Sequence, residues 1–299
     1  MSTELGLAIP PAGGCSRLLE GNSASFIQVG GLLVRPDFRA HWARVRSQAE
    51  KAKEYGHRVV VLLPLLQGGH SDVRLMRLLD SAVGVWADEV VASSLGSLWG
   101  LGKRDLPCPV TAGDFVKCFC SADAEVIADL GASKIRVTFE MNRGQVSRLA
   151  ENSPIPLQAT VHGRVTLGVL QDFAQNTLGA GTETLVLAGV KGGGALYEVH
   201  GKEMVSARSL MLLAQLGELR SVGVRSFLID ARYLTEKHAE CALRSYGLAL
   251  KAVETGEASA DLLAALADSV RETLLNTEFC NGWFFGKPGR DYVLPDCTS

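Results

Sequence analysis

The sequence lacks the features that mark membrane, secreted and nucleic-acid-binding proteins. Among its 299 residues, no apolar run reaches the roughly 20 residues that a membrane-spanning helix needs. The N-terminus Met1-Ser2-Thr3-Glu4 has neither the basic nor the apolar region of a secretion signal. Charged residues make up 21% of the chain and the net charge is -2, so the totals indicate neither a nucleic-acid nor a phospholipid partner. We therefore expect a soluble, cytoplasmic protein.

Cysteine is sparse, and its distribution excludes the usual cysteine-based architectures. The seven cysteines are an odd number in a chain without a secretion signal, which favours reduced thiols over a disulfide framework. Cys108, Cys118 and Cys120 form one loose group, but zinc loops usually place at least two residues between cysteines and need four ligands. No cysteine lies between Cys120 and Cys241. We interpret the group as core-filling thiols and predict no metal site there.

Short apolar strands alternate with amphipathic helices along the chain. Repeated strand–helix units are typical of a parallel sheet, and eight of them favour a closed (β/α)8 TIM-like barrel. An open doubly wound sheet is the alternative, since it needs fewer strands. The strands are expected at residues 5–9, 25–29, 58–64, 89–92, 109–112, 135–139, 157–161 and 224–229.

Two segments do not follow this alternation. Residues 163 to about 205 are rich in glycine and in short apolar runs typical of hairpins, so we predict an insertion after the seventh strand, above the strand ends. The tail from about 276 to 299 contains Trp283, Phe284 and Phe285 and is too aromatic to stay in water, so we expect it to pack on the barrel. We predict one domain over residues 1–299.

Polar side chains end several of the predicted strands. The last strand runs into Asp230-Ala231-Arg232-Tyr233, and Glu140 and His162 close two earlier strands. Because the carboxyl ends of barrel strands meet at one mouth, a carboxylate, an imidazole and a guanidinium are expected to converge there. We take Glu140, His162 and Arg232 as candidate catalytic residues. Weaker candidates for substrate binding are Lys117, Asp230, Tyr233 and His70.

Each of these residues also has a structural interpretation. Glu140 fits a solvated strand end or a helix cap, and His162 fits a hydrogen-bonded core histidine. Arg232 fits an ion pair with Asp230 or Glu140, because ion pairs are often structural. Spacing alone singles out no Ser-His-Asp or Cys-His arrangement.

Several stretches resemble peptidase family U32. The strand, acidic residue and arginine from Gly223 to Arg232 resemble the end of a barrel strand in that family, which usually has glutamate where this chain has Asp230. Val161-His162-Gly163 resembles the family's "vHG". Further likenesses, in the same order as in the family, lie at residues 7–13, 110–124, 131–140 and 279–289. The resemblance implies a (β/α)8-like barrel.

The resemblance also implies a choice of activities. Some members are described as collagenase-like peptidases, and others take part in oxygen-independent hydroxylation of tRNA, ribosomal RNA or ubiquinone precursors. The hydroxylation proteins carry an iron–sulfur cluster, whose cysteines lie just after "vHG" and in the following insertion. Here Thr166 stands where the first is expected, and the insertion has no cysteine. A four-iron cluster needs thiolates, so we predict no cofactor. A cluster built from Cys118, Cys120, Cys280 and another thiol stays an open alternative.

Three functions therefore compete. The first is a cluster-less subunit of an oxygen-independent hydroxylation system that binds a ring substrate, with a cluster-bearing paralogue as partner. The negative net charge favours a quinone precursor over RNA as that substrate. The second is the peptidase that the family name implies, for which no nucleophile or metal is evident. The third is a non-catalytic binding or scaffold protein.

Overall fold

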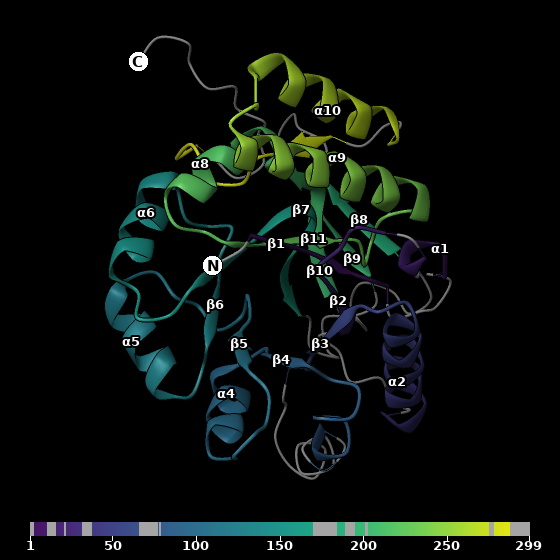
Figure 1. Ribbon diagram of the computed structural model, residues 1–299, viewed down its shortest axis with the longest axis vertical. Helices are drawn as coiled ribbons and strands as arrows, with labels where there is room; N and C mark the ends of the chain where they lie inside the picture. The colour runs from purple at the N-terminus through teal and green to yellow at the C-terminus, as the bar shows by residue number, and fades with distance from the viewer. Residues whose placement is uncertain are drawn as a thin grey trace.

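Parallel strands close into a barrel surrounded by helices (Figure 1). The computed structural model describes residues 3–10, 16–20, 22–31, 38–65, 77, 79–169, 184–188, 195–200, 203–274 and 278–287. β11 pairs in parallel with both β1 and β7, which closes the ring and confirms a (β/α)8 barrel over the open sheet. The barrel strands are β1 (Glu4–Ala8), β2 (Phe26–Gly30), β3 (Arg58–Leu62), β4 (Glu89–Ala92), β5 (Val110–Ala112), β6 (Lys134–Val137), β7 (Leu157–Val169) and β11 (Ser226–Asp230).

The helices begin and end where the sequence provides caps. Ser94, Asn142 and Thr235 each accept a hydrogen bond from a backbone N–H of the first helical turn, and Gly256 ends α9 in the left-handed region. The predicted helix after Met211 starts as a 3-10 turn, η1 (Leu213–Gln215). The others are α1 (Ser16–Leu19), α2 (Phe38–Glu54), α4 (Leu95–Gly102), α5 (Ser121–Asp129), α6 (Arg143–Asn152), α8 (Leu216–Ser221), α9 (Glu236–Thr255) and α10 (Ala260–Glu272).

The barrel has a small apolar interior and a larger apolar layer under the helices. Phe26 fills much of the interior, and its ring lies against Gly6. Only glycine fits at this position, because a Cβ there would lie 2.1 Å from the ring. The amino-terminal end of the interior is charged: Arg58 binds Glu4 at 2.8 Å, and Lys134 binds Glu89 at 3.1 Å. Ion pairs therefore close this end of the barrel, where residues of this fold serve stability rather than ligand binding.

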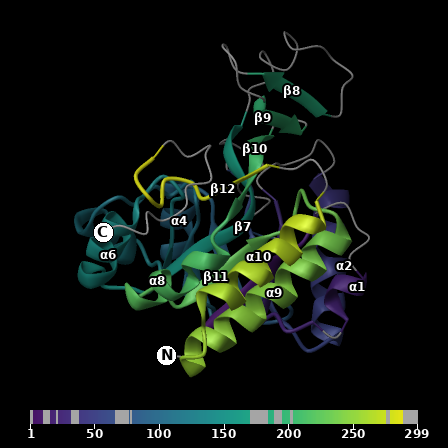
Figure 2. The same cartoon turned by 90° about the horizontal axis from the view of Figure 1, so that it is seen from above.

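The insertion forms an antiparallel sheet that projects beyond the barrel (Figure 2). It consists of β8 (Thr184–Ala188), β9 (Ala195–His200) and β10 (Glu203–Met211). β10 pairs with β7, which does not end near Val161 as predicted but continues to Val169. One strand thus belongs to the barrel and to the outer sheet.

The described part of the tail packs on the barrel, as predicted. β12 (Phe279–Cys280) pairs with β10, and Phe284 lies in the apolar layer. Trp283 is the exception, with 40% of its surface exposed. Across the described ranges, no helix is long and apolar enough to cross a membrane.

Candidate functional site

A small cavity lies at the mouth of the barrel, where the strands end. Its volume of about 20 Å³ is enough for one water molecule, because a water needs roughly 10–15 Å³ on the same measure. Charged and aromatic side chains share its wall. It is lined by Leu62, Asp114, Phe115, Phe139, Thr160, Arg164, Val165, Thr166, Asp230 and Arg232.

Arg232 is the most constrained residue of this wall. Its Nε donates to Asp230 Oδ1 at 2.9 Å and its Nη2 to Asp230 Oδ2 at 2.6 Å, in a bidentate pair. Its Nη2 also lies 3.3 Å from Thr166 Oγ1. Gly163 makes the contact between β7 and β11 possible, because its φ is +107° and a Cβ would lie 2.0 Å from the Asp230 carbonyl oxygen. The predicted ion pair between Arg232 and Asp230 is confirmed.

Glu203, which the sequence did not single out, brings a second carboxylate to Arg232. It lies on β10, accepts a hydrogen bond from the Tyr233 hydroxyl, and is 3.6 Å from Arg232 Nη1. Burial opposes the charge on Arg232, but Asp230 and Glu203 outweigh it and raise the pKa of the guanidinium. Burial, followed by Glu203, raises the pKa of Tyr233 as well, so this phenol keeps its proton.

Arg232 Nη1 has no hydrogen-bond partner within the described part of the chain, although it is buried. A buried N–H without an acceptor costs free energy, so an oxygen atom at this place is favoured. The arginine side chain is only 7% exposed.

Lys117 and Glu140 form a second, more open pair. Lys117 Nζ lies 2.7 Å from Glu140 Oε2, and Thr138 donates to the same oxygen. Burial raises the pKa of Glu140, but the hydrogen bonds from Lys117 and Thr138 and the charge of Lys117 outweigh it, so the pKa is lowered. Glu140 is therefore an ionised carboxylate, and its ion-pair partner is Lys117 rather than Arg232.

His162 does not join the mouth, so its predicted convergence with Glu140 and Arg232 is wrong. Strict alternation from Gln158 and Thr160, which both face the barrel interior, would place His162 there too. The pairing of β7 with β11 shifts register at this point, however, and the bulge turns His162 toward the helices. Its Nε2 lies 2.7 Å from Nε2 of His238 on α9.

The two histidines form a buried pair. Both are 0% exposed, and their rings stack at 5.0 Å between centroids. Desolvation and then the neighbouring His238 hold the pKa of His162 well below its usual value, and desolvation lowers the pKa of His238 to about 4. The pair is therefore neutral at pH 7 and joins β7 to α9.

Tyr233 and Lys117, two of the remaining predicted site residues, lie in the networks described above. Tyr233 belongs to the Arg232 network, and Lys117 to the pair with Glu140. His70 lies outside the described residues. Two further cations near the mouth also have carboxylate partners: Arg164 with Glu198, and Arg136 with Asp114.

The residues at the expected cluster position do not fit an iron–sulfur cluster. Thr166 offers a hydroxyl, which already accepts from Arg232, where the resemblance places a thiolate. In the described parts of the chain, no group of three or more His, Cys, Asp or Glu is placed to hold a metal ion. Burial raises the pKa of Cys118 to about 12, which keeps this thiol protonated. Cys15 and Cys297 lie outside the described residues.

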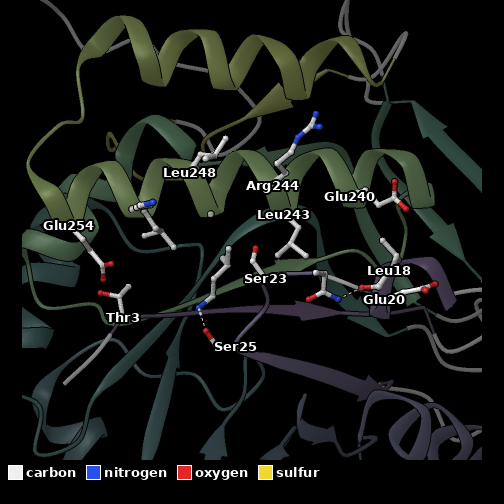
Figure 3. A pocket seen from close by; sticks show the side chains of 15 residues that line it. Thr3, Leu18, Glu20, Ser23, Ser25, Glu240, Leu243, Arg244, Leu248 and Glu254 are labelled. Atoms are coloured by element: carbon white, nitrogen blue, oxygen red, sulfur yellow. Dashed lines mark hydrogen bonds between the residues drawn. The ribbon is translucent and has the colours of Figure 1, made fainter. Parts of the chain in front are cut away.

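A larger groove of about 600 Å³ lies on another side of the molecule (Figure 3). It separates α9 from the segments that lead into β1 and β2, at the amino-terminal side of the barrel. Its lining includes the apolar residues Leu5, Leu18 and Leu243 and the charged residues Glu240 and Arg244. It contains no residue of the mouth, where ligands of this fold bind, so we place the candidate site at the mouth.

Comparison with known proteins bears on both the fold and the family. Residues 190–293 match the model of peptidase family U32. Over this segment the chain is similar to members of that family. The U32 segment includes β9, β10, β11 and the described tail, and thus Glu203, Asp230, Arg232 and Tyr233. No curated protein matches the sequence.

Solved structures resemble the whole barrel. A dihydrodipicolinate synthase superimposes with a TM-score of 0.52 at 11% identity, over 92% of this chain and 84% of that one. The U32 peptidase Mk0906 gives a TM-score of 0.43 at 18% identity, over 55% of this chain and 70% of that one. Likeness at such identities shows the barrel fold alone, so neither activity is transferred with it.

Proposed function

We propose that the protein binds a ring-shaped small molecule at the barrel mouth, as a cluster-less member of an oxygen-independent hydroxylation system. The observation that carries the proposal is Arg232 Nη1, a buried donor without an acceptor among the described residues, on a residue that lines a one-water cavity together with Phe115 and Phe139. The cavity has room for an oxygen substituent, which supplies the acceptor, while the ring itself, which is larger than the cavity, would lie outside it against the mouth. A quinone precursor fits this description better than RNA does.

Charge supports a small ligand over RNA. Recognition of RNA phosphates needs unpaired cations, whereas Arg136, Arg164, Arg232 and Lys117 each already face a carboxylate. A phosphate would have to displace these partners.

The redox part of the system would come from a partner. Since Thr166 and its surroundings do not fit a cluster, this chain contributes binding and orientation, and a cluster-bearing paralogue contributes electron transfer. Peptidase activity, which the name of the U32 segment suggests, is the alternative that the following experiment must also address.

The test compares Arg232→Lys with the matched control Arg208→Lys. Arg208 also pairs with a carboxylate, Glu278, but on the outer sheet. Lysine keeps the charge and loses the planar fork, so Arg232→Lys should weaken binding of phenol, measured by ligand-observed NMR, by at least about tenfold. Arg208→Lys should leave it unchanged. Equal binding by both variants, or hydrolysis of a peptide library by the wild type, would contradict the proposal.

A further inference from the structure

We propose that Glu203 sets the ligand specificity of the mouth, by favouring a neutral oxygen and rejecting a carboxylate. The inference rests on the proposed function and adds the chemical class of the group that meets Arg232. Glu203 reaches Arg232 from β10 of the insertion and is only 7% exposed. Its carboxylate and the ligand oxygen would share the same guanidinium nitrogen, since Oε2 lies 3.6 Å from Nη1.

The charges around Arg232 are unbalanced. One guanidinium faces two carboxylates, Asp230 and Glu203, while Arg164 and Arg136 are each matched by one acid. Among the described residues, the network therefore carries an excess negative charge. A ligand carboxylate at Nη1 would approach Glu203 and meet like-charge repulsion in a buried place, whereas a hydroxyl or carbonyl oxygen would not.

Glu203 is held in place by Tyr233. The Tyr233 hydroxyl donates to Glu203 Oε2, and the ring of Tyr233 lies 4.9 Å from that of His200 on β9, between centroids. Tyr233 thus fixes the second carboxylate near Arg232 and acts as a positioning residue. Removing its hydroxyl should free Glu203 to turn away.

The test uses two probes of similar shape, phenol and benzoate, and the isosteric variant Glu203→Gln. The wild type should bind phenol at least about tenfold more tightly than benzoate. Glu203→Gln removes the excess charge, so the ratio of the two dissociation constants should fall at least about tenfold, chiefly through tighter benzoate binding. Glu278→Gln, which alters an acid paired with Arg208 on the outer sheet, is the matched control and should keep the wild-type ratio.

Each outcome is decisive. A wild-type ratio in Glu203→Gln, with phenol still bound, would overturn the inference and leave the proposed function standing. If the wild type binds neither probe, the proposed function fails and the inference fails with it. If circular dichroism shows that Glu203→Gln does not fold, Tyr233→Phe decides instead: it should lower the ratio, and an unchanged ratio would overturn the inference.

Discussion

The buried pair of His162 and His238 makes stability depend on pH in a window where few other groups titrate. Thr273 Oγ1 donates to the Val270 carbonyl, so it accepts from His238 Nδ1 at 2.6 Å. The other nitrogen of His238 then accepts from His162 Nε2. This arrangement has one proton between the rings, and a second proton there would place two donors face to face.

The size of the effect follows from the pKa of His238. It falls from 6.5 to about 4 on folding, so between these values the unfolded chain binds a proton that the folded chain does not. Stability therefore decreases as the pH falls below 6.5. From pH 7.5 to 5.0 the loss from His238 amounts to about 2 kcal/mol of the free energy of unfolding. His162, whose pKa is also lowered, shifts the total in the same direction.

Urea unfolding at pH 7.5 and pH 5.0 measures this loss. The double variant His162→Gln/His238→Gln should lose most of the pH dependence, while His200→Gln, a matched change on the outer sheet, should keep it. Carboxylates with lowered pKa values, such as Glu4 and Glu140, lose their stabilising charge only below about pH 4.5 and do not interfere. An equal decrease in the wild type and the double variant would refute the reasoning.

Two further changes test the mouth. Gly163→Ala should destabilise the protein by roughly 3 kcal/mol or more, because a Cβ would lie 2.0 Å from the Asp230 carbonyl oxygen. Gly256→Ala is the control: its φ is +76° but nothing lies within 4 Å of the added Cβ, so it should cost about 1 kcal/mol. Thermal unfolding measures both changes. Lys117→Ala should change stability by less than about 1 kcal/mol, since the pair with Glu140 is about 40% exposed, yet raise the pKa of Glu140 in an NMR titration. An unchanged pKa would show that Lys117 does not hold this carboxylate.

The barrel was predictable because its strands carry their own signal. Arg58–Leu62 contains an unbroken run of valines from Val59 to Val61, and every residue from Val59 to Leu62 is buried, as in a strand covered on both faces. Helix caps such as Ser94 and Thr235, whose hydroxyls accept from the first turn, are also local features, although the sequence analysis did not single these two residues out. Both signals depend on residues that are close together in the chain, so they can be recognised in a single sequence.

The composition of the site was predictable only in part. Asp230, Arg232 and Tyr233 do lie together, because adjacent positions at a strand end cannot be far apart. The bulge that reverses His162 depends on pairing between strands distant in sequence, and no local pattern indicates it. Glu203 had no signal either, since it becomes a site residue only when β10 folds against β7.

The shared strand β7 limits how this protein can be taken apart. Its residues from Leu157 to Gly163 pair with barrel strands and those from His162 to Val169 pair with β10, so the two sets overlap. The outer sheet is therefore not an exchangeable module. A chimera that replaces part of it must keep β7 and β10 intact, whereas β8 and β9, which pair with each other and, through β9, with β10, can be exchanged without cutting the wall of the barrel.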